Sequence, residues 1–177
     1  METKPNSFIR HTLNYGIYTG GGLILFTLLM YSIDINMQSP LNYLGFIILA
    51  AGIFFGITSY RDNFGGGFIS YGKCIAAGAL ISLFASILVA IYSYLFFTFF
   101  DTTSIQKMLD LTEEELVKKG MTDEQIEMGM KYTAKFMTPV WMAIMSVVMY
   151  VFWGTIISLI IGIFAKKNDP SFEGQFK

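Results

Sequence analysis

Four apolar segments, each long enough to cross a lipid bilayer, occupy more than half of this 177-residue chain. They contain no Asp, Glu, Lys or Arg, and they cover residues 12–33, 41–60, 74–100 and 138–165. A hydrocarbon core about 30 Å thick needs about 20 apolar residues of α-helix. The sequence therefore predicts an all-α integral membrane protein with four transmembrane helices. Nothing outside these helices is large enough to form a core of its own, so residues 1–177 are expected to form a single domain.

The composition supports a membrane location and excludes one class of partner. Apolar residues make up 54% of the chain and charged residues 14%, whereas soluble domains contain about 25% charged residues. A soluble protein with four buried central helices is the alternative, and apolar runs of this length disfavour it. The net charge of -1 and the lack of a basic arm exclude a nucleic-acid partner.

Asp, Glu, Lys, Arg and His, the side chains on which most catalytic sites depend, are missing from the four segments. We therefore expect no enzymatic activity and no cofactor. The only cysteine, Cys74, can form neither an internal disulfide nor a cysteine-based metal site. Met142, Met145 and Met149 follow a helical spacing that would suit Cu(I). No Cys or His accompanies them, so a packing role is favoured and no metal is predicted.

The positions of Lys and Arg predict the orientation in the membrane. Four crossings place both termini on the same side as the connection 61–73. The cations on this side are Lys4, Arg10, Arg61, Lys73, Lys166, Lys167 and Lys177. Lys and Arg near helix ends favour the cytoplasmic side, so both termini are expected in the cytoplasm. The first apolar run is too long for a cleaved signal peptide, and His11, just before it, is expected to be an interfacial residue.

The two external connections differ in character. Residues 34–40 predict a tight turn, and Pro40 suits the first turn of the next helix. Residues 101–137 contain more acids than lysines and predict a short helical cap. Thr112 has the spacing of a capping box, Gly120 would end that helix, and Thr122 opens a second box.

The second helix of this cap runs toward Pro139 and is expected to be continuous with the fourth span. Its modestly apolar face consists of Ile126, Met130, Thr133 and Met137. The cap is either a docking surface for a partner or a solvated linker that folds back on the bundle, and we favour the linker.

Two GxxxG pairs lie inside the membrane segments, Gly16 with Gly20 and Gly52 with Gly56. Small residues at this spacing let two helix backbones approach closely in lipid. Packing between the first two helices is the favoured interpretation, and dimerisation of the chain is the alternative.

The densest group of candidate functional residues is the connection YRDNFGGGFISYGK, from Tyr60 to Lys73. Basic residues beside a flexible glycine backbone at the membrane surface could bind a lipid phosphate. The candidates are Arg61, Asp62, Gly65, Gly66, Gly67, Tyr71 and Lys73. A turn anchored by aromatic residues and cations is the simpler interpretation, and we favour it.

This connection, followed by an Ala/Gly-rich helix that reaches Ala90-Ile91-Tyr92-Ser93-Tyr94, resembles the domain of unknown function 4199 family. The resemblance extends over the acidic connection and the tail KKNDPSFEGQF. It implies a small four-helix protein of the bacterial inner membrane, of the kind known mainly from Bacteroidota. Members of the family are found near glycosyltransferases of the polyprenyl-phosphate-sugar type, an association that would favour a role with lipid carriers.

Three hypotheses about function follow. The first is a non-enzymatic scaffold or accessory subunit that contacts membrane lipid and either a membrane-protein partner or a second copy of the chain. The second is a small transporter or flippase component for a lipid-linked, polyprenyl-phosphate group. An intramembrane enzyme is the third, and the lack of an acid, base or nucleophile disfavours it.

Overall fold

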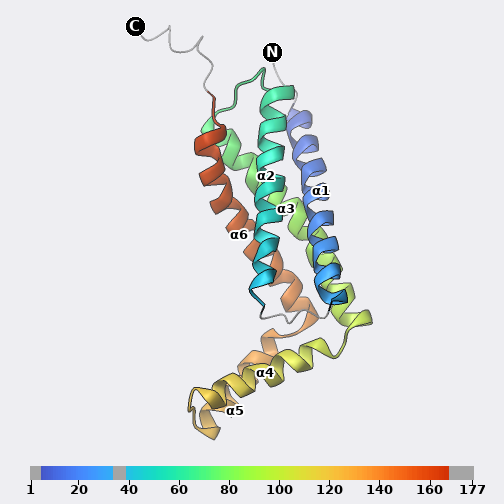
Figure 1. Cartoon of the computed structure of the whole chain (residues 1–177), viewed down its shortest axis with the longest axis vertical. Helices are drawn as coiled ribbons and strands as arrows, with labels where there is room; N and C mark the ends of the chain where they lie inside the picture. Colours follow the sequence, from blue (N-terminus) through green and yellow to red (C-terminus); the bar gives the residue numbers. More distant parts are fainter. Residues whose placement is uncertain (1–4, 34–38, 168–177) are drawn as a thin grey trace. The chain divides into compact units, whose positions relative to one another are not determined.

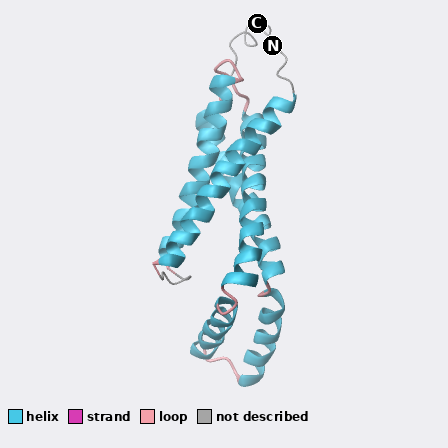
Figure 2. Cartoon of the chain, turned by 90° about the vertical axis from the view of Figure 1, so that its right-hand side faces the viewer, coloured by secondary structure: helices cyan, strands magenta, loops and turns pink. Residues whose placement is uncertain are grey.

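The computed structural model describes residues 5–33 and 39–167, and its regular elements are helices (Figure 2). In chain order they are α1 (Pro5–Ser32), η1 (Pro40–Tyr43), α2 (Leu44–Asn63), α3 (Tyr71–Leu95), η2 (Phe96–Phe100), α4 (Ser104–Lys118), α5 (Asp123–Phe136) and α6 (Pro139–Ala165). Four stretches are long and apolar enough to cross a membrane, namely Ser7–Ser32, Pro40–Asn63, Tyr71–Phe100 and Pro139–Ala165. The predicted fold class is thus confirmed, and the chain is a multi-pass membrane protein.

The helix boundaries differ from the hydropathy boundaries because a helix begins where the backbone allows it, not where apolarity starts. Helix α1 begins at Pro5, well before residue 12, with a proline in the position that a first helical turn accepts best. At the start of the second span, Pro40 opens the 3-10 turn η1, as predicted, and the hydroxyl of Ser39 accepts a hydrogen bond from the Leu41 amide (3.3 Å). Most of the predicted external turn, residues 34–38, lies outside the described residues, as do Lys4 and residues 168–177.

The described chain divides into two compact units. Unit 1 consists of residues 5–33, 39–89 and 147–167, and unit 2 consists of residues 90–146. Helices α3 and α6 contribute residues to both units.

Unit 1 is a bundle of α1, α2 and the adjoining parts of α3 and α6 (Figure 1). Its core is built from apolar residues that neighbouring helices bury between them. These residues are Leu49, Ile53, Ile57, Tyr60, Ile69, Cys74, Ala77, Ile81 and Ala165. Helix α3 is the most enclosed span, with 44% of its most apolar window buried against 17–28% for the others. Most residues of the other three spans are therefore exposed or half-buried, as expected for a bundle surrounded by lipid.

Helices α3 and α6 interlock through small residues. A Cβ atom added to Gly78 would overlap the Ser158 side chain, and one added to Gly154 would lie 2.5 Å from Cβ of Ser82. About two turns after Gly154 on α6, a Cβ on Gly162 would lie 3.2 Å from Cβ of Cys74. Such close approach gains dispersion contacts where lipid removes the hydrophobic effect between helices. The sequence analysis missed this contact because the glycines are paired across helices with Ser and Cys, not within a GxxxG motif.

The two GxxxG pairs also lie at helix contacts, but with different partners. A Cβ on Gly20 would lie 3.0 Å from the Ala85 carbonyl oxygen, so the first pair faces α3, not α2. Gly52 packs against Thr19 of α1, while Gly56 lies between Tyr15 of α1 and α3. Packing of the first two helices on each other therefore accounts for only the second pair.

Unit 2 contains the hairpin of α4 and α5, whose helix ends had been predicted from the sequence. Thr122 and Gln125 form the predicted capping box of α5. Gly120, with φ +72°, ends α4 as predicted, and the amides of Gly120 and Met121 bind carbonyl oxygens of the preceding turn. The box predicted at Thr112 is wrong, because this residue lies inside α4, where its hydroxyl donates to the Met108 carbonyl.

The start of α4 is instead set by Asp101. Its carboxylate accepts hydrogen bonds from the Ser104 amide (3.0 Å) and the Thr103 hydroxyl (3.0 Å). A short acidic side chain just before a helix satisfies amides that lack an intrahelical partner. This start was missed because Asp101 directly follows an apolar run and has no Glu or Gln three residues later.

Helices α5 and α6 are separate, which corrects the expectation of a continuous helix. Helix α5 ends at Phe136, and the Thr138 hydroxyl accepts a hydrogen bond from the Trp141 amide (3.4 Å) at the start of α6. Proline disfavours the α conformation for the residue before it and has no backbone N–H to donate. Thr138-Pro139 therefore interrupts the helix.

Candidate functional site

The loop between α2 and α3, residues 64–70, is fastened to the end of α6. The Ile69 amide donates to the Lys167 carbonyl (3.0 Å), and the Lys167 amide donates to the Ile69 carbonyl (3.1 Å). These two bonds hold together chain segments that are far apart in the sequence. The end of α2, the start of α3 and the end of α6 therefore meet at one end of unit 1, which we call the Arg61 end.

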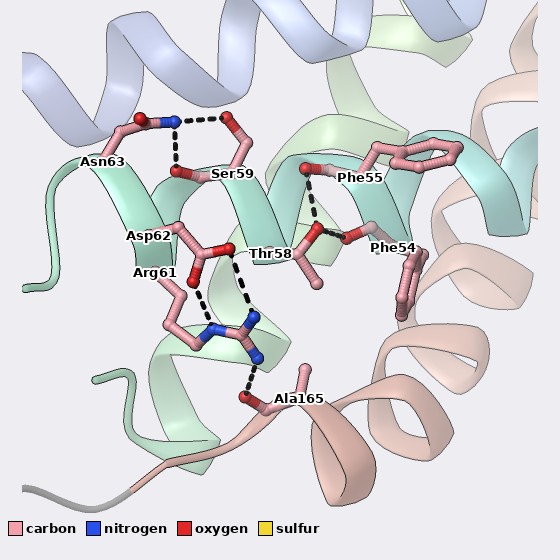
Figure 3. A network of polar contacts seen from close by, with 8 residues as sticks. All are labelled: Phe54, Phe55, Thr58, Ser59, Arg61, Asp62, Asn63 and Ala165. Atoms are coloured by element: carbon pink, nitrogen blue, oxygen red, sulfur yellow. Dashed lines mark hydrogen bonds and ion pairs between the residues drawn. The ribbon is translucent and has the colours of Figure 1, made fainter. Parts of the chain in front are cut away.

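Arg61 connects the last turn of α2 to the last residue of α6 (Figure 3). Its Nε donates to Oδ1 of Asp62 (2.7 Å) and one Nη donates to Oδ2 (3.2 Å), a bidentate ion pair. The other Nη donates to the carbonyl oxygen of Ala165 (3.3 Å), which has no partner inside its own helix. The Arg61 side chain is only 17% exposed, whereas that of Asp62 is 57% exposed. Arg61 therefore acts as a cap for α6.

The three glycines of the loop have different roles. Gly66 (φ +59°) and Gly67 (φ +87°) occupy the left-handed region, as their flexibility allows. Gly65 is needed for space: a Cβ there would overlap the Phe68 carbonyl oxygen and lie 2.9 Å from the Arg61 carbonyl oxygen. The glycine run thus folds the chain back tightly enough for Ile69 to reach Lys167.

The remaining candidates, Tyr71 and Lys73, point to different surroundings. The Tyr71 hydroxyl donates to the Leu159 carbonyl of α6 (3.2 Å), and its ring covers Gly162. Lys73 is exposed on the first turn of α3. The structure therefore gathers Arg61, Asp62 and the glycines at the end of α6. Tyr71 binds the same helix at Leu159, before its end.

An aromatic cluster beside this loop was missed by the sequence analysis. His11, expected at the membrane surface, is only 9% exposed, and its Nε2 lies 3.0 Å from the Gly56 carbonyl oxygen. Its ring packs against Tyr15 (4.8 Å between centroids), Phe64 (5.3 Å) and Tyr60 (5.5 Å). A lone histidine at the start of an apolar run carries no signal of such burial. The cluster fixes α1 against α2 at the Arg61 end.

A metal site requires several ligands that converge. Within residues 5–33 and 39–167, no three His, Cys, Asp or Glu side chains are grouped in this way. Met145 and Met149 are about half exposed on α6 (47% and 48%), and Met142 is half-buried. Met145 and Met149 therefore lie on the exposed side of α6.

Replacing Arg61 by methionine should loosen the end of α6. The variant keeps an unbranched apolar stem but loses the bonds to Asp62 and Ala165, and we expect a local cost of about 1–2 kcal/mol. Hydrogen exchange of the Lys166 and Lys167 amides, which bind the Gly162 and Ile69 carbonyls, measures this change. Asp62→Asn is the matched control, because the Asp62 side chain is 57% exposed and asparagine can still accept a hydrogen bond from Arg61. Equal exchange rates in the two variants would contradict the capping role.

Comparison with known proteins adds a family but no activity. Neither curated proteins nor solved structures give a significant match to the chain. A family model described as "Protein of unknown function (DUF4199)" matches residues 14–167, which include most of the first span, the other three spans, the α2–α3 loop and the α4–α5 hairpin. The chain therefore belongs to the DUF4199 family of proteins of unknown function.

Proposed function

We propose that this protein is a non-enzymatic scaffold or accessory subunit of a complex in the bacterial inner membrane, with both termini in the cytoplasm. The observation that carries this proposal is the interlocking of small residues between the helices of unit 1. Gly78 with Ser158, Gly154 with Ser82, and Gly52 with Thr19 bring backbones so close that one added methyl group would overlap a neighbour.

Interlocked faces favour a static bundle over a moving one. A transporter that alternates its access must slide or rock one group of helices against another. In this bundle such a movement would separate close contacts between α3 and α6 and between α1 and α2, and it would also break the bond from Arg61 to Ala165. The contacts instead suit a unit that presents a fixed outer surface.

The outer surface of unit 1 offers large apolar side chains to lipid or to partner helices. Ile47 (63% exposed) and Phe55 (60%) lie on the same side of α2, and Phe164 (80%) lies near the end of α6. Exposed apolar residues in a membrane protein usually contact lipid, and a subset contacts partner helices. A scaffold would use such a face to bind a membrane-protein partner.

The alternative function, handling of a lipid-linked phosphate group, has weaker support. Arg61 already binds Asp62 and the end of α6, so only part of its hydrogen-bonding capacity remains. Lys73 and Lys167 are exposed near the loop and would have to bind the phosphate. The sequence candidates for this site therefore stay a proposal.

Photo-crosslinking in native membranes tests the scaffold. A photoreactive phenylalanine analogue is placed at Ile47 and at Phe55, with the buried Leu49 (0% exposed) as the control on the same helix. We expect the two exposed positions to capture the same protein and Leu49 to capture none. Adducts with lipid alone at both exposed positions would contradict the proposal.

A second variant, made in the strains used for crosslinking, distinguishes the scaffold from a transporter of a lipid-linked group. Lys73→Gln combined with Lys167→Gln leaves the Arg61 contacts intact and removes two exposed cations. A scaffold predicts unchanged crosslinking at Phe55 and unchanged export of lipid-linked sugars in this variant. Loss of export with crosslinking retained would favour the transporter.

A further inference from the structure

Helix α5 carries a second apolar face, which the α4–α5 hairpin leaves uncovered. Its predicted face, with Ile126 and Met130, is half-buried in unit 2. Roughly opposite, Met128 (58% exposed), Tyr132 (63%) and Phe136 (55%) follow each other at four-residue intervals. Helix α4 shows no such stripe: among its large apolar side chains, Val117 alone is highly exposed (58%) within this described helix. The uncovered stripe is therefore a property of α5.

Charge is distributed unevenly along α5. Asp123, Glu124 and Glu127 occupy the first turns, which contain no lysine. Lys131 and Lys135 are exposed beside the stripe in the last turns, which contain no acid. The end of α5 that carries the aromatic residues is thus also its basic end.

The basic, aromatic end is joined directly to a transmembrane helix. Only Met137 and Thr138 separate α5 from Pro139, where the span α6 begins. The ring of Phe136 packs edge-on against Trp141 in the first turn of α6, with 5.5 Å between centroids. Trp141 (41% exposed) and Val140 (53%) continue the apolar surface. The last turns of α5 are consequently held next to the start of the candidate span α6.

Tyr, Phe and Trp beside lysines are the side chains that the boundary between headgroups and acyl chains accepts best. A helix with a charged face and an aromatic face lies in this boundary with its apolar side buried about 5–10 Å deep. Lysine side chains can extend from there to lipid phosphates. If the stripe were exposed to water, three large apolar side chains would remain in contact with water, whereas contiguous apolar surface usually marks a site of interaction.

We propose that the C-terminal half of α5 is an in-plane anchor that docks on the lipid headgroups, with Tyr132 and Phe136 inserted and Lys131 and Lys135 on lipid phosphates. The acidic first turns stay in water, so the helix is tilted with its Phe136 end deepest.

Site-directed spin labelling tests the anchor in the full chain. Cys74 is the only cysteine of the chain and is buried. Cys74→Ala keeps the contacts of its Cβ atom and gives a protein without thiols, so that a spin label attaches only to a newly introduced cysteine. New cysteines replace Tyr132 and Phe136, and Lys118→Cys on α4 serves as an exposed control. The protein is reconstituted into vesicles of phosphatidylethanolamine and phosphatidylglycerol, and collision rates with oxygen and with a water-soluble nickel complex give the depth of each label.

We expect labels at 132 and 136 to collide more with oxygen than with nickel, at depths of about 5–10 Å, and the label at 118 to show the reverse. Nickel-accessible labels at 132 and 136 would overturn the proposal, because the stripe would then lie in water. Labels shielded from both reagents would also overturn it, because a protein would then cover the stripe. Far-UV circular dichroism of each variant confirms that the helices are retained.

Discussion

Replacing Gly78 by alanine is expected to lower the free energy of unfolding of the bundle by about 1–3 kcal/mol, the usual cost of overpacking. The new methyl group would overlap the Ser158 side chain of α6 and lie 3.1 Å from Cγ2 of Ile53 on α2. Neither neighbour can move aside easily, because both lie fully buried. Helices α3 and α6 would have to separate along the whole interlocked face.

Cys74 provides the measurement. It is the only cysteine of the chain and is fully buried, next to Gly162 in the same contact, so a thiol-reactive dye reports when α3 and α6 come apart on heating. Adding Ser158→Gly to Gly78→Ala removes the overlap and should restore most of the lost stability. Gly21→Ala is the matched control, because no atom lies within 4 Å of its added Cβ. Identical melting curves for Gly78→Ala and Gly21→Ala would show that the contact is not as close as described.

Alanine at Gly65 is expected to open the α2–α3 loop. The added Cβ meets two backbone carbonyl oxygens, those of Phe68 and Arg61, and neither can rotate away. The bonds from the Phe68 amide to Gly65 and from the Gly67 amide to Arg61, both 3.0 Å, would be lost or strained. At about 1 kcal/mol each, their loss should raise the population of the open loop about 30-fold.

Hydrogen exchange of the Ile69 and Lys167 amides measures this opening, since these two amides form the bridge between the loop and α6. Gly72→Ala, with no atom within 4 Å of the new Cβ, should leave their exchange unchanged. Gly66→Ala should have an intermediate effect, because its φ of +59° costs an L-residue about 1–2 kcal/mol without any overlap. If the Gly65 and Gly72 variants exchanged at the same rate, the tight fold of the loop would be refuted.

The sequence located the candidate loop but not what its residues do. Arg61 was selected as a cation at the membrane surface that could bind a phosphate. Only the structure shows its guanidinium on the Ala165 carbonyl, more than one hundred residues later in the chain. No local pattern predicts a partner at that separation. The glycines were selected for flexibility, and that reason holds for Gly66 and Gly67, whereas Gly65 is required for space.

The unexpected burial of His11 has the same origin. Its hydrogen bond reaches the Gly56 carbonyl and its ring contacts Tyr60 and Phe64, so two positions on α2 and the first residue of the α2–α3 loop determine its environment. Hydropathy assigns a residue to a depth in the membrane but not to a face of the bundle. For the same reason, Gly16 and Gly20 could be recognised as contact residues while their partner helix, α3, could not.

The sequence by itself determined the four charge-free spans, because the bilayer imposes a fixed length and excludes charge whatever the helices touch. It also determined the turn at Gly120 and the cap at Thr122, whose physics involves only a few neighbouring residues. The tertiary structure alone decided which small residues of the spans interlock and which cation caps which helix. These depend on the rotation of each helix about its axis, and nearly uniform apolar helices contain no periodic pattern that would fix that rotation.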